Sequence, residues 1–108
     1  MKVKELIEGL GLTVLTEGDL DRECTGCYSG DLLSWVMSRA RENDIWLTVM
    51  GNINAVAVAV LTDCACIVLT ESSPLDENAR QRALGQNVTV LRSEKNAYEL
   101  SVLISKLL

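Results

Sequence analysis

The amino-acid sequence predicts an α/β domain with a mainly parallel sheet and helices packed on its faces. From residue 23 to the end of the 108-residue chain, strand-like and helix-like segments alternate. Such alternation favours parallel pairing, because a right-handed crossover between neighbouring parallel strands requires a helix between them. The chain has the length of one ordinary domain, and no linker, repeat or low-complexity tract divides it. We therefore expect residues 1–108 to form a single domain.

A helix and a short strand should come first. Apolar side chains recur at helical spacing from Val3 to Leu10, and Gly11 follows where the helix would end. Residues 13–15 form the expected strand, and residues 16–20 form a polar turn.

The next extended segment spans residues 23–29 and leads into a helix that begins after Gly30. Asp31 is the expected N-cap, because its carboxylate can accept hydrogen bonds from the free backbone N–H groups of the first turn. The apolar positions of this helix predict its buried face, which consists of Leu32, Leu33, Val36, Met37 and Ala40.

The central part of the chain should form a strand, a helix and a second strand. Residues 45–49 are the first of these strands. The run 55–61 alternates Ala with Val and fits either a strand or a helix. If it were a strand, only two residues would link it to the next strand at residues 64–70, without the Gly or Asn that such a short hairpin needs. We therefore predict a helix that begins at Asn52 or Asn54.

The last third of the sequence predicts two further helices around a strand. Ser73-Pro74 is a typical helix start, with an N-cap followed by Pro at the first helical position, and Gly85 supplies the end. Residues 88–91 form the last expected strand. Asn96, with Glu99 three residues later, caps the final helix. Its buried stripe should consist of Leu100, Leu103, Ile104 and Leu107.

The charge pattern argues against two classes of partner. The formal net charge is −5, and the ten Lys and Arg residues are scattered without a basic run. Binding to nucleic acid or to an anionic membrane depends on clustered cations, so we expect neither partner. The sequence starts without an apolar signal segment, and its longest apolar run, Ala55–Leu61, is far shorter than the roughly 20 residues that span a bilayer. We expect a cytoplasmic protein.

The residue types argue against catalysis. The chain contains no His, which removes the commonest general base and the imidazole metal ligand. Neither a G-x-x-x-x-G-K-[ST] phosphate loop nor a G-x-G-x-x-G fingerprint occurs. We therefore expect a non-catalytic protein without a cofactor. An enzyme that uses Asp21, Arg22 or Tyr28 as acid–base groups is the weakest alternative.

The most informative segment runs from Asp21 to Leu33. It gathers glycines, hydroxyls, a phenol and a charged pair at a strand-to-helix junction, where backbone can approach a ligand. The segment resembles the motif of the DRTGG domain family at Asp21, Arg22, Thr25, Gly26, Tyr28, Gly30, Asp31, Leu32 and Leu33. Cys27 replaces the second glycine of that motif. The resemblance continues through Asp44–Trp46 and Ala55–Leu69, and so covers nearly the whole chain.

This resemblance implies a fold like the N-terminal domain of HPr kinase/phosphorylase. Related domains also occur inside some phosphotransacetylases and between the CBS domains of certain pyrophosphatases, as non-catalytic modules for regulation or subunit association. We expect a regulatory or binding module that acts through self-association or a small ligand, with a homodimer as the default assembly. Its partner would be a small molecule or a protein. The candidate ligand-binding residues are Asp21, Arg22, Thr25, Gly26, Tyr28, Ser29, Gly30 and Asp31.

Structural roles compete with ligand binding in this segment. Asp21 and Arg22 can form a local salt bridge, and Asp31 can serve purely as an N-cap. Open parallel sheets bind ligands at the carboxyl ends of their strands, which here means the loops near residues 26–31, 50–54 and 70–73. A polar crevice there is our expectation, although loops are polar in any case.

The four cysteines give a rival hypothesis. Cys24 and Cys27 have C-x-x-C spacing and Cys64 and Cys66 have C-x-C spacing, so four thiolates could bind zinc or an iron–sulfur cluster. The first pair could instead be redox active. Cys64 and Cys66 should point to one face of a buried strand, where Cys acts as a small hydrophobe. We therefore expect no metal, and keep the four-cysteine site as the alternative.

Overall fold

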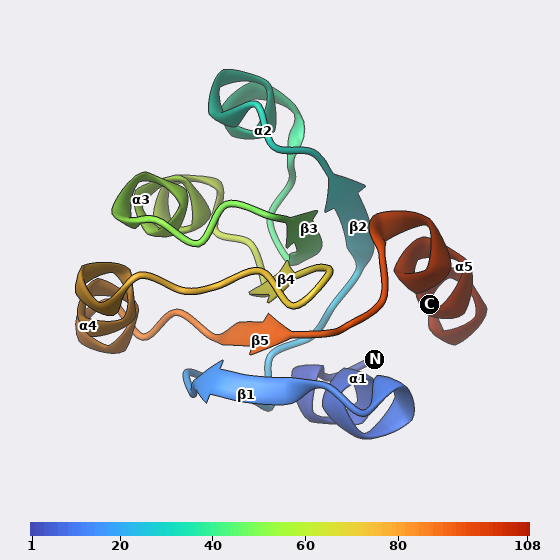
Figure 1. Ribbon diagram of the computed structural model, residues 1–108. Helices are drawn as coiled ribbons and strands as arrows, with labels where there is room; N and C mark the ends of the chain where they lie inside the picture. The colour runs from blue at the N-terminus through green and yellow to red at the C-terminus, as the bar shows by residue number, and fades with distance from the viewer.

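A five-stranded sheet organises the chain, which the computed structural model describes over residues 1–108 (Figure 1). The strands are β1 Thr13–Thr16, β2 Gly26–Ser29, β3 Asp44–Thr48, β4 Cys66–Leu69 and β5 Val90–Arg92. The helices are α1 Val3–Leu10, α2 Leu33–Arg39, α3 Ile53–Thr62, α4 Glu77–Gly85 and α5 Ala97–Leu107. The strand order is β1-β5-β4-β3-β2, in which β2 to β5 run parallel and β1 pairs antiparallel with β5. The predicted α/β fold with a mainly parallel sheet is confirmed.

Helices cover both faces of this sheet. Because β2, β3, β4 and β5 are neighbours in chain order, each of α2, α3 and α4 connects two adjacent parallel strands. Right-handed crossovers place all three of these helices on one face. Helices α1 and α5 cover the other face (Figure 1). The longest helix has 11 residues, and none combines the length and the apolar character needed to cross a membrane.

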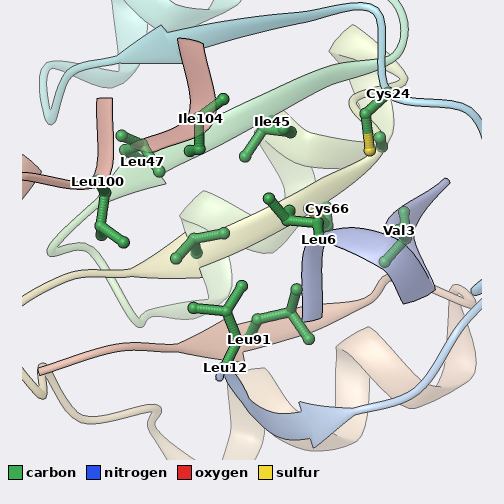
Figure 2. Close-up of a cluster of buried hydrophobic side chains, with 12 residues drawn as sticks. Val3, Leu6, Leu12, Cys24, Ile45, Leu47, Cys66, Leu91, Leu100 and Ile104 are labelled. Atoms are coloured by element: carbon green, nitrogen blue, oxygen red, sulfur yellow. The ribbon is translucent and has the colours of Figure 1, made fainter. Parts of the chain in front are cut away.

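Two apolar clusters fill the space between the sheet and the helices. On the side of α1 and α5, Leu6 and Leu100 lie in the same cluster as Ile45 and Leu47 of β3 (Figure 2). On the opposite side, Trp46 is fully buried among the small side chains of α3 and α4. Alternate residues of β3 thus serve opposite faces, as the two-residue period of a strand requires.

Several sequence signals act as predicted. Gly11 follows α1 with a left-handed φ of 61°. The Asn52 side chain caps α3 by accepting a hydrogen bond from the Ala55 N–H at 2.9 Å, so the ambiguous Ala-Val run is a helix. Asn96 and Glu99 form a reciprocal capping box at the start of α5.

Asp31 does not cap α2, which corrects the sequence prediction. The helix begins at Leu33, and Leu32 occupies the N-cap position without a side-chain hydrogen bond. The Asp31 carboxylate instead accepts hydrogen bonds from the Thr48 hydroxyl at 2.8 Å and the Val49 N–H at 2.9 Å. These donors are within reach because β2 and β3 end side by side.

The predicted buried face of α2 is only partly correct. Val36 is fully buried and Leu33 and Ala40 are half-buried, but Leu32 and Met37 are exposed. The helix lies at the β2 edge of the sheet and packs beside α3, so neighbouring elements cover only a narrow side of it (Figure 1).

Helix α4 begins later than the sequence predicts. The Ser73 hydroxyl donates to a carbonyl in its own turn, and the Asp76 N–H donates to the Gly51 carbonyl at 2.8 Å. These bonds hold the chain across the end of the sheet before the helix starts at Glu77, with Asp76 as N-cap. Gly85 is the last helical residue instead of the first residue after the helix.

The final helix has a shorter buried stripe than predicted. Leu100 and Ile104 are buried and Leu103 is half-buried, whereas Leu107 is exposed. Leu107 lies at the end of α5 close to Gly9 of α1.

Candidate functional site

Strand β2 divides the segment Asp21–Asp31 between the two ends of the sheet. Asp21 to Thr25 precede the strand, whereas Gly30 and Asp31 follow it. A strand of this length separates its two ends by roughly 13 Å. The candidate residues therefore form two groups at opposite ends of β2, with Gly26, Tyr28 and Ser29 between them.

Asp21 connects the segment to the start of the chain. Its carboxylate lies 2.8 Å from the Lys4 ammonium and 3.9 Å from the Lys2 ammonium. The hydrogen bond and the charge of Lys4 lower the pKa of Asp21 from its ordinary value. All three side chains are largely exposed, so these pairs add little to stability.

Arg22 connects the loops that lead into two central strands. Its Nε donates to Asn43 Oδ1 at 2.9 Å, and its Nη1 lies 2.9 Å from Asp63 Oδ1. Nη2 donates to the Asp63 carbonyl, which also accepts from the Asn43 N–H. Asn43 and Asp63 both have left-handed backbone conformations. Arg22 thus stabilises the turns before β3 and β4, and neither Asp21 nor Arg22 pairs with the other.

The middle of the segment lines an open cleft beside the edge strand. Thr25, Gly26, Cys27 and Tyr28 form one wall, and Arg39, Arg41, Glu42 and Asp44 form the other. Its cavity volume is about 420 Å³. We call these eight residues the motif cleft. Gly26 is required there, because a Cβ at this position would lie 2.5 Å from Asp44 Oδ1.

The charged side chains of the motif cleft differ in the partners that the protein gives them. The carboxylate of the buried Asp44 accepts a hydrogen bond from the Arg41 backbone N–H at 2.8 Å. The Arg41 guanidinium has no carboxylate within ion-pair distance. The Arg39 guanidinium stacks 3.8 Å above the Trp35 ring. Although Cys27 as a residue is exposed, desolvation of its thiol and the Asp44 charge raise its pKa to about 11.

The far end of the segment holds β2 and β3 together. The Gly30 carbonyl accepts a hydrogen bond from the Trp46 indole N–H at 2.9 Å. A Cβ on Gly30 would lie 3.0 Å from the Tyr28 ring, so glycine lets this ring pack closely. Asp31 bonds to the end of β3 as described above, while Ser29 is exposed at the end of β2.

The four cysteines do not come together, which excludes the four-thiolate site that their spacing suggested. Cys64 belongs to the apolar cluster under α3 and α4, whereas Cys66 and Cys24 belong to the cluster under α1 and α5. Cys27 lies apart at the sheet edge. The prediction that Cys64 and Cys66 share a face is wrong, because Cys64 lies in the turn before β4. No group of three or more Cys, Asp or Glu residues is placed to hold a metal ion.

Sequence reasoning missed Arg39 and Arg41 as members of a site. Neither residue belongs to the buried face that the apolar pattern of α2 predicts. A right-handed crossover, however, returns the end of α2 to the amino end of β3, which pairs with the amino end of β2. Tracing this crossover residue by residue would have placed Arg39 and Arg41 beside the start of β2.

One solved structure with this fold comes from Clostridium perfringens. It contains the CBS and DRTGG domains of the regulatory region of a pyrophosphatase, complexed with the activator diadenosine tetraphosphate. The similarity has a TM-score of 0.73 at 12% sequence identity. It covers 95% of this chain but 45% of that chain, so this chain spans less than half of its structural neighbour. Comparison with curated proteins gives no match.

The family assignment rests on a match along almost the whole chain. The DRTGG domain family matches residues 5–107. This range contains all five strands and the complete segment Asp21–Leu33, so it includes both walls of the motif cleft. The chain therefore belongs to the DRTGG domain family.

Proposed function

We propose that this chain is a cytoplasmic regulatory module that binds a small anionic ligand in the motif cleft. One observation carries the proposal. Three residues of the family motif, Thr25, Gly26 and Tyr28, line the same cleft as Arg39 and Arg41, although the arginines come from a different part of the sequence. In a protein with a net charge of −5, two guanidinium groups at one cleft favour an anion.

The lining residues indicate the chemistry of the ligand. Arg holds phosphate or carboxylate groups through paired N–H donors, and the Thr25 hydroxyl can add another donor. The Tyr28 ring offers a flat apolar surface. Glu42 and Asp44 accept hydrogen bonds, so the ligand should carry N–H donors as well as its anion. A phosphorylated nucleoside combines these groups.

The structural neighbour gives limited support for this ligand class. Its regulatory region is complexed with diadenosine tetraphosphate, which is a phosphorylated nucleoside. That region contains CBS domains as well as a DRTGG domain, so the similarity of fold assigns the activator to neither. The proposal for this chain therefore rests on its own cleft.

The other candidate residues support the cleft in this proposal. Asp21 and Arg22 fix the approach to β2, and Gly30 and Asp31 fix its end. Ser29 lies exposed beside them. We therefore assign ligand contact to Thr25, Gly26 and Tyr28, and positioning to Asp21, Arg22, Gly30 and Asp31; Ser29 receives no role.

The motif cleft suits binding better than catalysis. The pKa of Cys27, near 11, keeps its thiol protonated at neutral pH, and a protonated thiol is a poor nucleophile. The charge of Arg22 is paired with Asp63 and is not free to act on a substrate. Ligand binding that changes the chain's contacts with other proteins or domains is the proposed mode of action.

Isothermal titration calorimetry with AMP, ATP and diadenosine tetraphosphate tests the proposal. The wild-type protein should bind at least one of them. Arg41→Gln should weaken that binding by at least about tenfold, because a hydrogen bond to a charged group is lost. Arg82→Gln is the matched control, since Arg82 lines a different cleft beside α3. The absence of binding to all three compounds, or equal affinity of the two variants, would overturn the proposal.

Self-association is a second candidate function, and the surface of α2 favours it. Leu32, Trp35 and Met37 are 59%, 54% and 50% exposed. They belong to the segment that directly follows β2, an edge strand that pairs only with β3. Exposed apolar groups beside an unpaired strand edge are typical of a surface that joins another chain. We propose a homodimer through this surface.

A further inference from the structure

The carboxyl ends of β4 and β5 lie where the chain leaves the sheet in opposite directions. The two strands are adjacent and parallel. The chain passes from β4 to α4 on one face, and from β5 to α5 on the other face (Figure 1). In open α/β sheets, ligands bind where neighbouring connections diverge in this way. The other parallel pairs lack this divergence, because α2, α3 and α4 share one face.

A polar cleft occupies this position. Its lining includes Thr13, Ser72, Arg92, Ser93, Glu94 and Lys95, and its cavity volume is about 550 Å³. We call it the switch-point cleft. It is separate from the motif cleft, with which it shares no residue. The two clefts lie against opposite edge strands of the sheet, β1 and β2.

Unpaired positive charge distinguishes the switch-point cleft. Arg92 ends β5 and is half-buried, and no carboxylate lies within ion-pair distance of it. Lys95 is unpaired as well, while Glu94 is the one acidic residue of the lining. An anionic partner stabilises a partly desolvated guanidinium. Without such a partner, the group loses hydrogen bonds to water on burial and forms none to replace them.

Backbone hydrogen bonds hold the two loops of this cleft together. The Ser72 N–H donates to the Ser93 carbonyl, and the Glu71 N–H donates to the Lys95 carbonyl, both at 2.9 Å. Glu71 and Ser72 have left-handed φ values of 54° and 55°, a conformation that such residues rarely adopt. The contacts between the loops maintain it. These backbone bonds hold Ser72 and Ser93 next to each other in the lining of the same cleft as Arg92.

The backbone N–H groups at the start of α5 are not the donors of this site. Asn96 and Glu99 already satisfy backbone N–H groups there through their capping box. The donors available to a ligand are therefore side chains, from Arg92, Lys95 and the three hydroxyl residues of the lining. This donor set fits an oxyanion with several acceptor oxygens.

We propose that the switch-point cleft binds the phosphate group of a small-molecule ligand, as a site separate from the motif cleft. Arg92 contacts two phosphate oxygens, Lys95 contributes the second positive charge, and the hydroxyls of Thr13, Ser72 and Ser93 donate to the remaining oxygens. The negative charge of Glu94 repels the phosphate group and weakens its binding.

Titration of ¹⁵N-labelled protein with inorganic phosphate and with AMP, followed by NMR at constant ionic strength, tests the proposal. At least one probe should shift the amide signals of Ser72, Ser93 and Lys95 saturably, with a Kd at or below about 1 mM. Arg92→Gln should weaken this binding by at least about tenfold, and Arg92→Lys by less. Arg82→Gln should bind as the wild type does. Glu94→Gln should bind more tightly.

The spectra also separate this proposal from binding in the motif cleft, because signals of Thr25 to Tyr28 report that cleft independently. If Arg92→Gln proves unfolded by its spectrum, Lys95→Gln replaces it, since Lys95 is exposed and its loss leaves the sheet intact. The proposal is overturned if neither probe saturates, if shifts appear elsewhere and not at the switch-point cleft, or if the folded Arg92 or Lys95 variant binds phosphate as the wild type does.

Discussion

Arg22 is joined to Asp63 by two contacts, an ion pair of 2.9 Å with its carboxylate and a hydrogen bond to its carbonyl. Asp63 adopts the left-handed conformation that ends α3 and begins the turn into β4. Arg22 therefore stabilises a turn 41 positions away in sequence. The most conspicuous charged residue of the family motif has a structural role, and its loss should affect folding before it affects any ligand.

Replacing Arg22 tests this role directly. Arg22→Ala should lower the free energy of unfolding by about 1–2 kcal/mol, because it removes hydrogen bonds to Asn43 and Asp63 from a half-buried group. Urea unfolding followed by circular dichroism measures the change. Arg80→Ala removes an exposed pair with Glu77 and serves as control, with no measurable loss expected. Equal stability of the two variants would show that Arg22 is not a structural anchor.

Gly26 should tolerate no side chain. A Cβ would lie 2.5 Å from Asp44 Oδ1, and Asp44 is buried and bonded to the Arg41 N–H, so it cannot move freely. Gly26→Ala should destabilise the protein by about 1–3 kcal/mol. Gly85→Ala is the control, since nothing lies within 4 Å of its Cβ position and Ala favours the helix. Thermal unfolding of both variants checks the prediction, which fails if Gly26→Ala is as stable as Gly85→Ala.

The order of elements could be predicted because local signals dominate it. Asn52 and Asn96 cap their helices by themselves, and the alternation of segments determines the parallel sheet. The predicted starts of two helices were wrong where a polar side chain or a backbone N–H group had a better hydrogen-bond partner elsewhere in the fold. Asp31 bonds to the end of β3, and Asp76 donates its N–H to Gly51. Such partners depend on strand register, which periodicity does not contain. The likeness to the N-terminal domain of HPr kinase/phosphorylase stays a prediction.

The candidate site was harder to predict than the fold. The motif gave Thr25, Gly26 and Tyr28, but the cleft is completed by Arg39 and Arg41, whose position depends on the path of α2. For the cysteines, sequence spacing was misleading. Cys64 and Cys66 are two residues apart, yet they lie on opposite faces because the strand begins only at Cys66.

Stability should decline at alkaline pH because of Cys64. Cys64 is 8% exposed, and burial raises the pKa of its thiol from 9.0 to about 12. The unfolded chain therefore releases this proton first, so the contribution is fully present below pH 9 and is lost as the pH rises toward 12. At pH 10 the share of the loss that comes from Cys64 should be roughly 1 kcal/mol. Urea unfolding in reducing buffer at pH 7 and 10 measures it. Cys64→Ala should show a smaller decline, and an equal decline would refute the assignment.

Cys27 should be the first thiol to react with an alkylating reagent, and it should react slowly. It is the exposed cysteine, whereas Cys24, Cys64 and Cys66 are buried. With a pKa of about 11, roughly one Cys27 in a thousand is a thiolate at pH 8. Iodoacetamide treatment followed by mass spectrometry should give a single adduct in the folded protein and four adducts in denaturant. Rapid modification at neutral pH would contradict the raised pKa.

Trp35 should carry the proposed self-association. Trp35 is 54% exposed, three positions after the exposed Leu32, on the helix that follows the edge strand β2. Large aromatic side chains contribute most to protein interfaces, and a charge in their place cannot be buried without a partner. Sedimentation equilibrium should show a dimer for the wild type and at least about tenfold weaker association for Trp35→Glu. Tyr98→Glu introduces the same charge at an exposed aromatic residue of α5 and should leave the dimer intact. A wild-type monomer at tens of micromolar, about the range of ordinary assays, or equal effects of both substitutions, would exclude this surface as the interface.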